Sequence, residues 1–130
     1  MKMSHTNKQI FRALFEEDVL LDRKAGVKIG LIRDRFFISV NDQPMQEGMC
    51  QSIQILLNSF KECEIIDKKD YPWTCTEAMT IAFKFKCVIE MKTRMPCKLH
   101  FNENQVMCYE SGTPCEISED WQKASWRVVE

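Results

Sequence analysis

The sequence predicts an α+β fold, a single domain (1–130) with a mainly antiparallel sheet, open or barrel-like, of about five to six strands and two principal helices packed on it. Three observations lead to this prediction. Residues 79–92 alternate apolar and polar side chains, which is typical of a strand with one buried face. Two other stretches place apolar residues three and four positions apart, as amphipathic helices do. The 130 residues suffice for one core and are too few for two ordinary domains.

The strand predicted at residues 79–92 organises the expected sheet. Its odd positions, from Met79 to Met91, are all apolar, whereas Lys84, Lys86 and Lys92 stand at even positions. Successive side chains of a strand point to opposite faces, so we expect one face on a core and a mostly charged face toward solvent or a partner.

The other elements follow from local patterns along the chain. A helix is predicted at 7–21, because Thr6 and Gln9 form a capping-box pattern before its apolar stripe. A second helix is predicted from Pro44 to Phe60, with the proline in its first turn. Ser118 is a candidate cap for a short helix near the C-terminus. Shorter apolar or alternating runs predict strands at 26–32, 36–40, 63–66, 97–101 and 105–109.

The ends of the chain differ in composition from its middle. We expect residues 1–6 to fray and residues 111–130 to form a loosely attached acidic segment. No apolar stretch follows Lys2, so a secretory signal is not expected. No run approaches the roughly 20 apolar residues that a membrane span requires, so no membrane partner is expected.

The seven cysteines indicate a reducing environment. Their number is odd, no two have C-x-x-C spacing, and Cys87 lies at an apolar position of the predicted central strand. A buried free thiol behaves as a small hydrophobic side chain. We therefore expect all seven to be reduced and the protein to be cytoplasmic or nuclear.

No pattern of reactive residues is specific enough to assign catalysis, a metal or a cofactor. Cys97 and His100 have C-x-x-H spacing, but residues three apart on a strand point to opposite faces. His5 is the one other histidine, in the segment expected to fray. No catalytic residue and no metal ligand is assigned, and a small α+β enzyme with a pocket under its helices is the third-ranked function.

The first-ranked function is a non-enzymatic protein-interaction or scaffold module, whose partner is another protein or a second copy of itself in an oligomer. Eight Phe, eight Met and three Trp exceed what one small sheet and two helices need. Tryptophan often dominates binding energy, so Trp73, Trp121 and Trp126 are the predicted partner-binding residues.

The second-ranked function is binding of single-stranded nucleic acid on a basic sheet face. The formal net charge is −1, so no globally basic surface exists, but positive residues cluster in the middle of the chain. The predicted phosphate-binding residues, here called the basic strip, are Lys84, Lys86, Lys92, Arg94 and Lys98.

Overall fold

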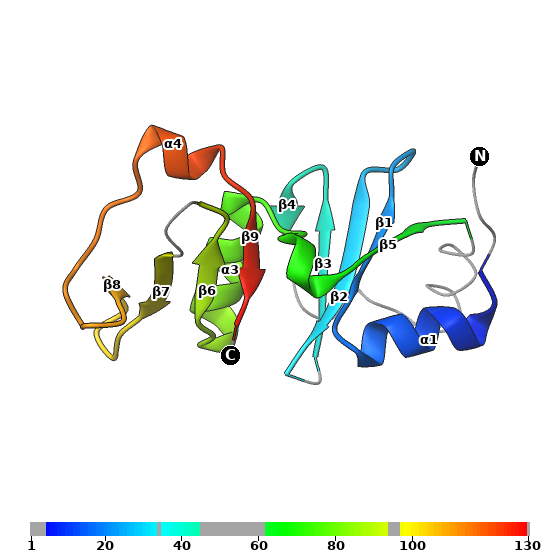
Figure 1. Cartoon of the computed structure of the whole chain (residues 1–130), viewed down its shortest axis with the longest axis horizontal. Coiled ribbons are helices and arrows are strands. Elements are labelled where there is room, and N and C mark those ends of the chain that lie inside the picture. The colour runs from blue at the N-terminus through cyan, green and yellow to red at the C-terminus, as the bar shows by residue number, and fades with distance from the viewer. Residues whose placement is uncertain (1–4, 34, 45–61, 94–96, 130) are drawn as a thin grey trace. The chain divides into compact units, whose positions relative to one another are not determined.

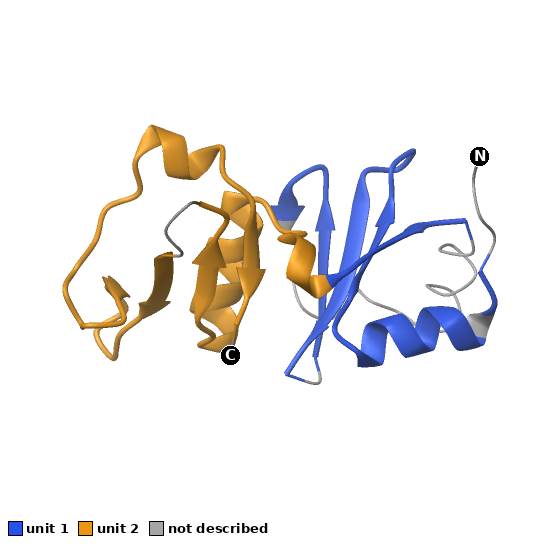
Figure 2. Cartoon of the chain, in the orientation of Figure 1, with its two compact units in different colours: residues 1–67 blue, residues 68–130 orange. Residues whose placement is uncertain are grey.

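The computed structural model describes residues 5–33, 35–44, 62–93 and 97–129. It confirms the α+β class and the antiparallel pairing of the strands. The strands form two sheets rather than the single expected one, with five strands in the first and four in the second. The chain divides into two compact units, residues 1–67 and residues 68–130, each with one of the sheets (Figure 1, Figure 2).

The described residues of the first unit form one helix and five strands. Its sheet has the order β4-β3-β2-β1-β5, and all its pairs are antiparallel. The strands predicted at 26–32, 36–40 and 63–66 are confirmed. The elements are α1 (Asn7–Phe15), β1 (Val19–Asp22), β2 (Val27–Ile32), β3 (Arg35–Val40), β4 (Gln43–Pro44) and β5 (Glu64–Ile66).

Helix α1 begins where predicted and ends earlier. The Thr6 side chain accepts the backbone N–H of Gln9, and the Gln9 side chain accepts the N–H of Thr6, so the capping box is confirmed. The helix stops at Glu16, and Glu17 has a left-handed φ of 66°. Acidic side chains at a helix C-terminus oppose the macrodipole, which favours this early end. The prediction that the helix continues to residue 21 is therefore wrong, because 19–22 form β1.

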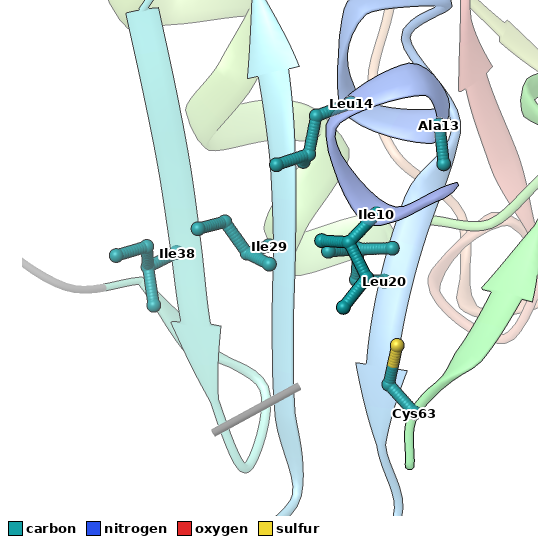
Figure 3. Packing of buried hydrophobic residues seen from close by; sticks show 7 residues of the cluster. All are labelled: Ile10, Ala13, Leu14, Leu20, Ile29, Ile38 and Cys63. Atoms are coloured by element: carbon teal, nitrogen blue, oxygen red, sulfur yellow. The ribbon is translucent and has the colours of Figure 1, made fainter. Parts of the chain in front are cut away.

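The core of the first unit lies between α1 and one face of its sheet. Figure 3 shows Ile10, Ala13 and Leu14 of α1 pointing toward the apolar side chains of the strands. Leu20 and Ile29 are Cα partners across β1 and β2, so they stand on the same face. The remaining buried members of this cluster are Ile38 and Cys63.

The glycine before β2 is required by its surroundings. Gly26 has a φ of 68°, in the left-handed region that favours glycine. A Cβ built there would overlap the side chain of Asn41, whose backbone N–H donates to the Gly26 carbonyl at 2.8 Å. The second helix, predicted from Pro44 to Phe60, lies outside the described residues except for Pro44, which belongs to β4.

In residues 68–93 and 97–129, the second unit has a four-stranded sheet, two helices and a 3-10 turn. Its sheet has the order β8-β7-β6-β9, again with antiparallel pairs (Figure 1). The hairpin predicted at 97–101 and 105–109 is confirmed. The elements are η1 (Lys68–Asp70), α3 (Cys75–Phe85), β6 (Ile89–Met91), β7 (Cys97–Phe101), β8 (Met107–Tyr109), α4 (Glu119–Gln122) and β9 (Trp126–Val128).

The long strand predicted at 79–92 is wrong, because its first half belongs to helix α3. Thr74 caps this helix and forms a capping box with Glu77, in which each side chain accepts the other residue's backbone N–H. Buried Ala78, Ile81 and Phe85 follow helical spacing, whereas Phe83, which a strand would bury, is 48% exposed. Only Ile89–Met91 forms a strand in this stretch.

The C-terminal segment is partly built into the second sheet. Ser118 accepts the backbone N–H of Trp121 and caps α4, as predicted. Residues 126–128, within the segment expected to be loosely attached, form β9 and pair with β6. None of the described helices is long and apolar enough to cross a membrane.

The six cysteines that the structure describes carry free thiols, and Cys50 lies outside the described residues. Burial raises the pKa of the Cys63 thiol to about 11, from its ordinary value of 9.0. We expect a thiol reagent to alkylate Cys63 about 100-fold more slowly in the folded chain than in the unfolded chain at pH 8. The reason is that the higher pKa lowers the thiolate population by about that factor, and the thiolate is the reactive form.

Mass spectrometry after a timed pulse of iodoacetamide, with and without denaturant, measures this rate ratio. The denatured chain serves as the control for intrinsic reactivity. Because the pKa of Cys63 is higher in the folded chain, the protonated thiol contributes to the free energy of unfolding. This contribution is fully present below about pH 9 and is lost as the pH rises toward about 11. Equal labelling rates in the two states would contradict the burial of this thiol.

Candidate functional site

The two faces of the second sheet differ in what covers them. Helix α3 contacts β6, β7 and β9, and its Phe83 packs edge-on against Phe101 of β7, with ring centroids 5.3 Å apart. Trp121 of α4 packs against Trp126 of β9 and Tyr109 of β8, with centroid distances of 6.5 and 6.2 Å. Both helices therefore lie on the face that carries these aromatic rings, and we call the other face the open face.

A row of alternating charges crosses the open face. In the register of the sheet, Glu90 of β6 stands between Arg127 of β9 and Lys98 of β7. Continuing the β7–β8 register by one residue places Glu110 opposite Lys98. The order is positive, negative, positive, negative, and opposite charges on neighbouring strands stabilise a sheet. These four residues are the charge row.

The Glu90 end of the charge row is buried. The Glu90 side chain is 4% exposed, and its Oε1 lies 2.6 Å from one terminal nitrogen of Arg127 and accepts the Arg127 Nε–H at 2.8 Å. Tyr71 donates its hydroxyl to the same oxygen at 3.0 Å, and the Arg127 guanidinium lies 4.9 Å from the centre of the Tyr71 ring. Burial, followed by the Glu90 carboxylate, raises the pKa of Tyr71. At this end, Glu90, Arg127 and Tyr71 are therefore bonded to one another within the chain.

The Lys98 end of the charge row borders a hollow. A cavity of about 350 Å³ is lined by residues of the open face. Val88 and Val129 are paired by the hydrogen bond from the Val129 N–H to the Val88 carbonyl, at 2.8 Å. The residues lining the cavity, here called the hollow, are Val88, Lys98, His100, Glu110 and Val129.

The polar groups of the hollow have few partners. Lys98 Nζ lies 3.5 Å from Glu110 Oε1, and this is its one ion pair in the described part of the chain. The two side chains are 40% and 62% exposed. The half-buried His100 ring has no hydrogen-bond partner among the described residues. Glu110 stands in a turn closed by the bond from the Gly112 N–H to the Tyr109 carbonyl, at 2.8 Å.

The β8 edge of the second sheet and the Trp126 position of its β9 edge are paired with the chain itself. Trp73 pairs with Trp126 of β9 through two main-chain hydrogen bonds, of 3.0 and 2.8 Å. Beside β8, the Tyr109 N–H donates to the Thr113 carbonyl, and the Cys115 N–H donates to the Met107 carbonyl. Strand addition needs free main-chain groups at an edge, and these pairings remove such groups from β8 and from Trp126.

The three predicted partner-binding tryptophans lie together on the helix-covered side of the second unit. Trp73 is 4% exposed and Trp126 is 0% exposed, while Trp121 is half-buried. The Trp126 indole N–H donates to the Trp121 carbonyl at 3.3 Å. Their place in the fold is that of core residues, and only Trp121 has substantial surface left for a partner.

The basic strip does not lie on one strand face. Lys84 belongs to α3, and Lys86 is its left-handed C-cap, with a φ of 53°. Lys98 stands on the open face, opposite the helices, and Arg94 is outside the described residues. The shared strand face expected for Lys84, Lys86 and Lys92 is wrong because residues 79–85 are helical.

Cys97 and His100 stand on opposite faces of β7 by strand alternation, as expected. Within the described ranges, no group of three or more His, Cys, Asp or Glu side chains could hold a metal ion.

Sequence reasoning missed the open face as a unit. Tyr71, Glu90, Arg127 and Glu110 were not singled out, and Lys98 was read only as part of the basic strip. One signal was present, because Glu90, Lys98 and Arg127 each stand among apolar residues in a short strand. Their alignment needs the strand order, which local patterns do not supply. Comparison with protein-family models, curated proteins and solved structures finds no match for this chain.

Proposed function

We propose that this chain is a non-enzymatic protein-binding module that holds its partner on the open face of the second sheet. The hollow beside Lys98 and His100 is the observation that carries the proposal. The other face of this sheet is covered by α3 and α4, and the chain's own main chain pairs with the β8 edge and with Trp126 at the β9 edge. The open face therefore remains as the surface for a partner.

The hollow suits one anchoring side chain of a partner. Its volume of about 350 Å³ is near the lower end of the range for ligand pockets, which is roughly 300–1,000 Å³. Val88 and Val129 offer apolar contact, and Lys98, His100 and Glu110 offer directional polar contact. Interfaces draw most of their affinity from a few side chains seated in such pockets.

An enzyme receives less support from this site. The described lining residues include no serine, threonine or cysteine, so nucleophile–base chemistry has no candidate there. General acid–base catalysis by His100 and Glu110 is the remaining way in which these residues could serve an enzyme. Nucleic-acid binding also receives less support, because Lys84 and Lys98 lie on opposite sides of the second sheet.

We further propose a cytoplasmic or nuclear location, with a second copy of the chain as the alternative partner. The free thiols of the described cysteines support the location, because reducing compartments preserve them. Solution mass by light scattering separates the two kinds of partner. A stable dimer would indicate self-association.

The proposed surface is tested by filling the hollow. Val129→Trp places a large side chain in the lining, and Lys84→Ala changes an exposed residue of α3 as the matched control. Peptides selected from a random display library on the wild-type chain should bind Val129→Trp at least about tenfold more weakly and Lys84→Ala unchanged. Fluorescence polarisation of labelled peptides measures both affinities.

Two outcomes would contradict the proposal. Failure to select any peptide above background would remove the binding role, and equal affinity of the wild type and Val129→Trp would move the contact surface elsewhere. A submicromolar affinity for single-stranded RNA or DNA that weakens steeply with salt would favour the nucleic-acid alternative instead.

A further inference from the structure

We infer that the group recognised in the hollow is a carboxylate on an acidic side chain of the partner protein, and that Glu110 occupies the carboxylate position until the partner arrives. This inference rests on the binding role proposed above and names the chemistry of its ligand. Lys98 and His100 are the recognising residues, and Glu110 is an internal competitor.

The hollow offers more hydrogen-bond donors than its own residues use. A lysine ammonium has three N–H donors, and Lys98 has one ionic partner, Glu110, in the described part of the chain. A histidine ring carries at least one N–H in either tautomer, and the His100 ring has no partner there. Both side chains line the same cavity, so a hydrogen-bond acceptor placed in it can receive an N–H from the Lys98 ammonium and an N–H from the His100 ring.

The Lys98–Glu110 pair is suited to exchange, whereas the Arg127–Glu90 pair is not. Glu110 is 62% exposed, stands in a turn and meets Lys98 at 3.5 Å, and exposed ion pairs of this kind contribute little to stability. Glu90 is 4% exposed and is held by Arg127 and the Tyr71 hydroxyl together. A ligand can therefore displace Glu110 without unfolding the sheet.

Charge balance favours a carboxylate over a more highly charged anion. The charge row alternates in sign, and exchanging the Glu110 carboxylate for a ligand carboxylate preserves that order. A phosphate dianion would bring a second negative charge close to Glu110. The described residues that line the hollow include no arginine to receive it, and Arg127 of the charge row already binds Glu90.

The inference is tested with two capped tripeptides that differ only in charge. The probes are acetyl-Val-Glu-Val-amide and acetyl-Val-Gln-Val-amide, with inorganic phosphate as a third probe, titrated into the full chain and followed by amide chemical shifts. The glutamate peptide should bind about fivefold more tightly than the glutamine peptide and should shift the signals of Lys98, His100 and Val129.

Two variants separate the internal competitor from the recognising lysine. Glu110→Gln removes the competing charge at similar size and should tighten the glutamate peptide about fivefold, whereas Lys98→Met should weaken it at least about fivefold. Thermal melting of each variant verifies that the fold is retained, and Lys84→Met is the control for loss of one positive charge.

Each outcome bears on one proposal or on both. Equal binding of the glutamate and glutamine peptides, equal binding of phosphate, or no gain from Glu110→Gln would overturn the carboxylate inference and leave the binding role intact. If neither peptide binds the wild type or Glu110→Gln, the inference is overturned. If, in addition, the display library yields no peptide for the wild type, the binding role is removed as well.

Discussion

Replacing Trp126 with alanine is expected to lower the free energy of unfolding by about 3–5 kcal/mol, the usual cost of removing a large buried aromatic ring. Trp126 is 0% exposed, packs against the Trp121 ring and donates its indole N–H to the Trp121 carbonyl. Its main chain also joins Trp73 to β9. Loss of the ring leaves a cavity where α4 meets the sheet.

Chemical denaturation followed by circular dichroism measures this change. Trp121→Ala is the matched control, because Trp121 is half-buried and should cost about 1–2 kcal/mol. Equal effects of the two substitutions would contradict the placement of Trp126 inside the second unit.

Replacing Arg127 with methionine is expected to destabilise the chain by about 3–5 kcal/mol, because it leaves the Glu90 carboxylate buried without its counter-charge. Glu90 is 4% exposed, and within the described part of the chain Arg127 is its one ionic partner and the Tyr71 hydroxyl is its neutral partner. A neutral hydroxyl cannot offset the desolvation of a carboxylate alone.

The double variant Arg127→Met with Glu90→Met should recover most of that loss, since two apolar side chains replace the pair. Lys98→Met, at the exposed end of the charge row, is the control and should cost at most about 1 kcal/mol. Urea unfolding of the wild type, the two single variants Arg127→Met and Glu90→Met, and the double variant gives the coupling energy. Additive losses in the double variant would show that the two side chains do not depend on one another.

The sequence predicts those elements whose local signals agree. Strands β2 and β3 follow alternating or apolar runs separated by a short polar connection, and both capping boxes can be read from a threonine and a Glu or Gln three residues later. The capping box of Thr74 and Glu77 lies directly before an alternating pattern that predicts a strand, so the two local signals conflict there. Ile81 and Phe85 satisfy both a two-residue and a helical period, so the cap is what distinguishes the two readings.

The candidate site depends on information that local patterns lack. Strand β9 pairs with β6, and Arg127 meets Glu90 across 37 positions of the chain. The hollow also needs the β7–β8 register, which brings Glu110 opposite Lys98. Short stretches of sequence show each residue of the charge row separately. Only the strand order β8-β7-β6-β9 brings these residues into one row.

The late position of β9 in the chain has a consequence for synthesis on the ribosome. Strand β6 gains its second neighbour only when residues 126–128 have left the exit tunnel, because β9 closes the sheet from the far end of the unit. Until then the nascent chain holds Glu90 without Arg127 and Trp73 without its pairing residue. Long sequence separation slows such closure, so this half of the chain completes its fold after translation of its last strand.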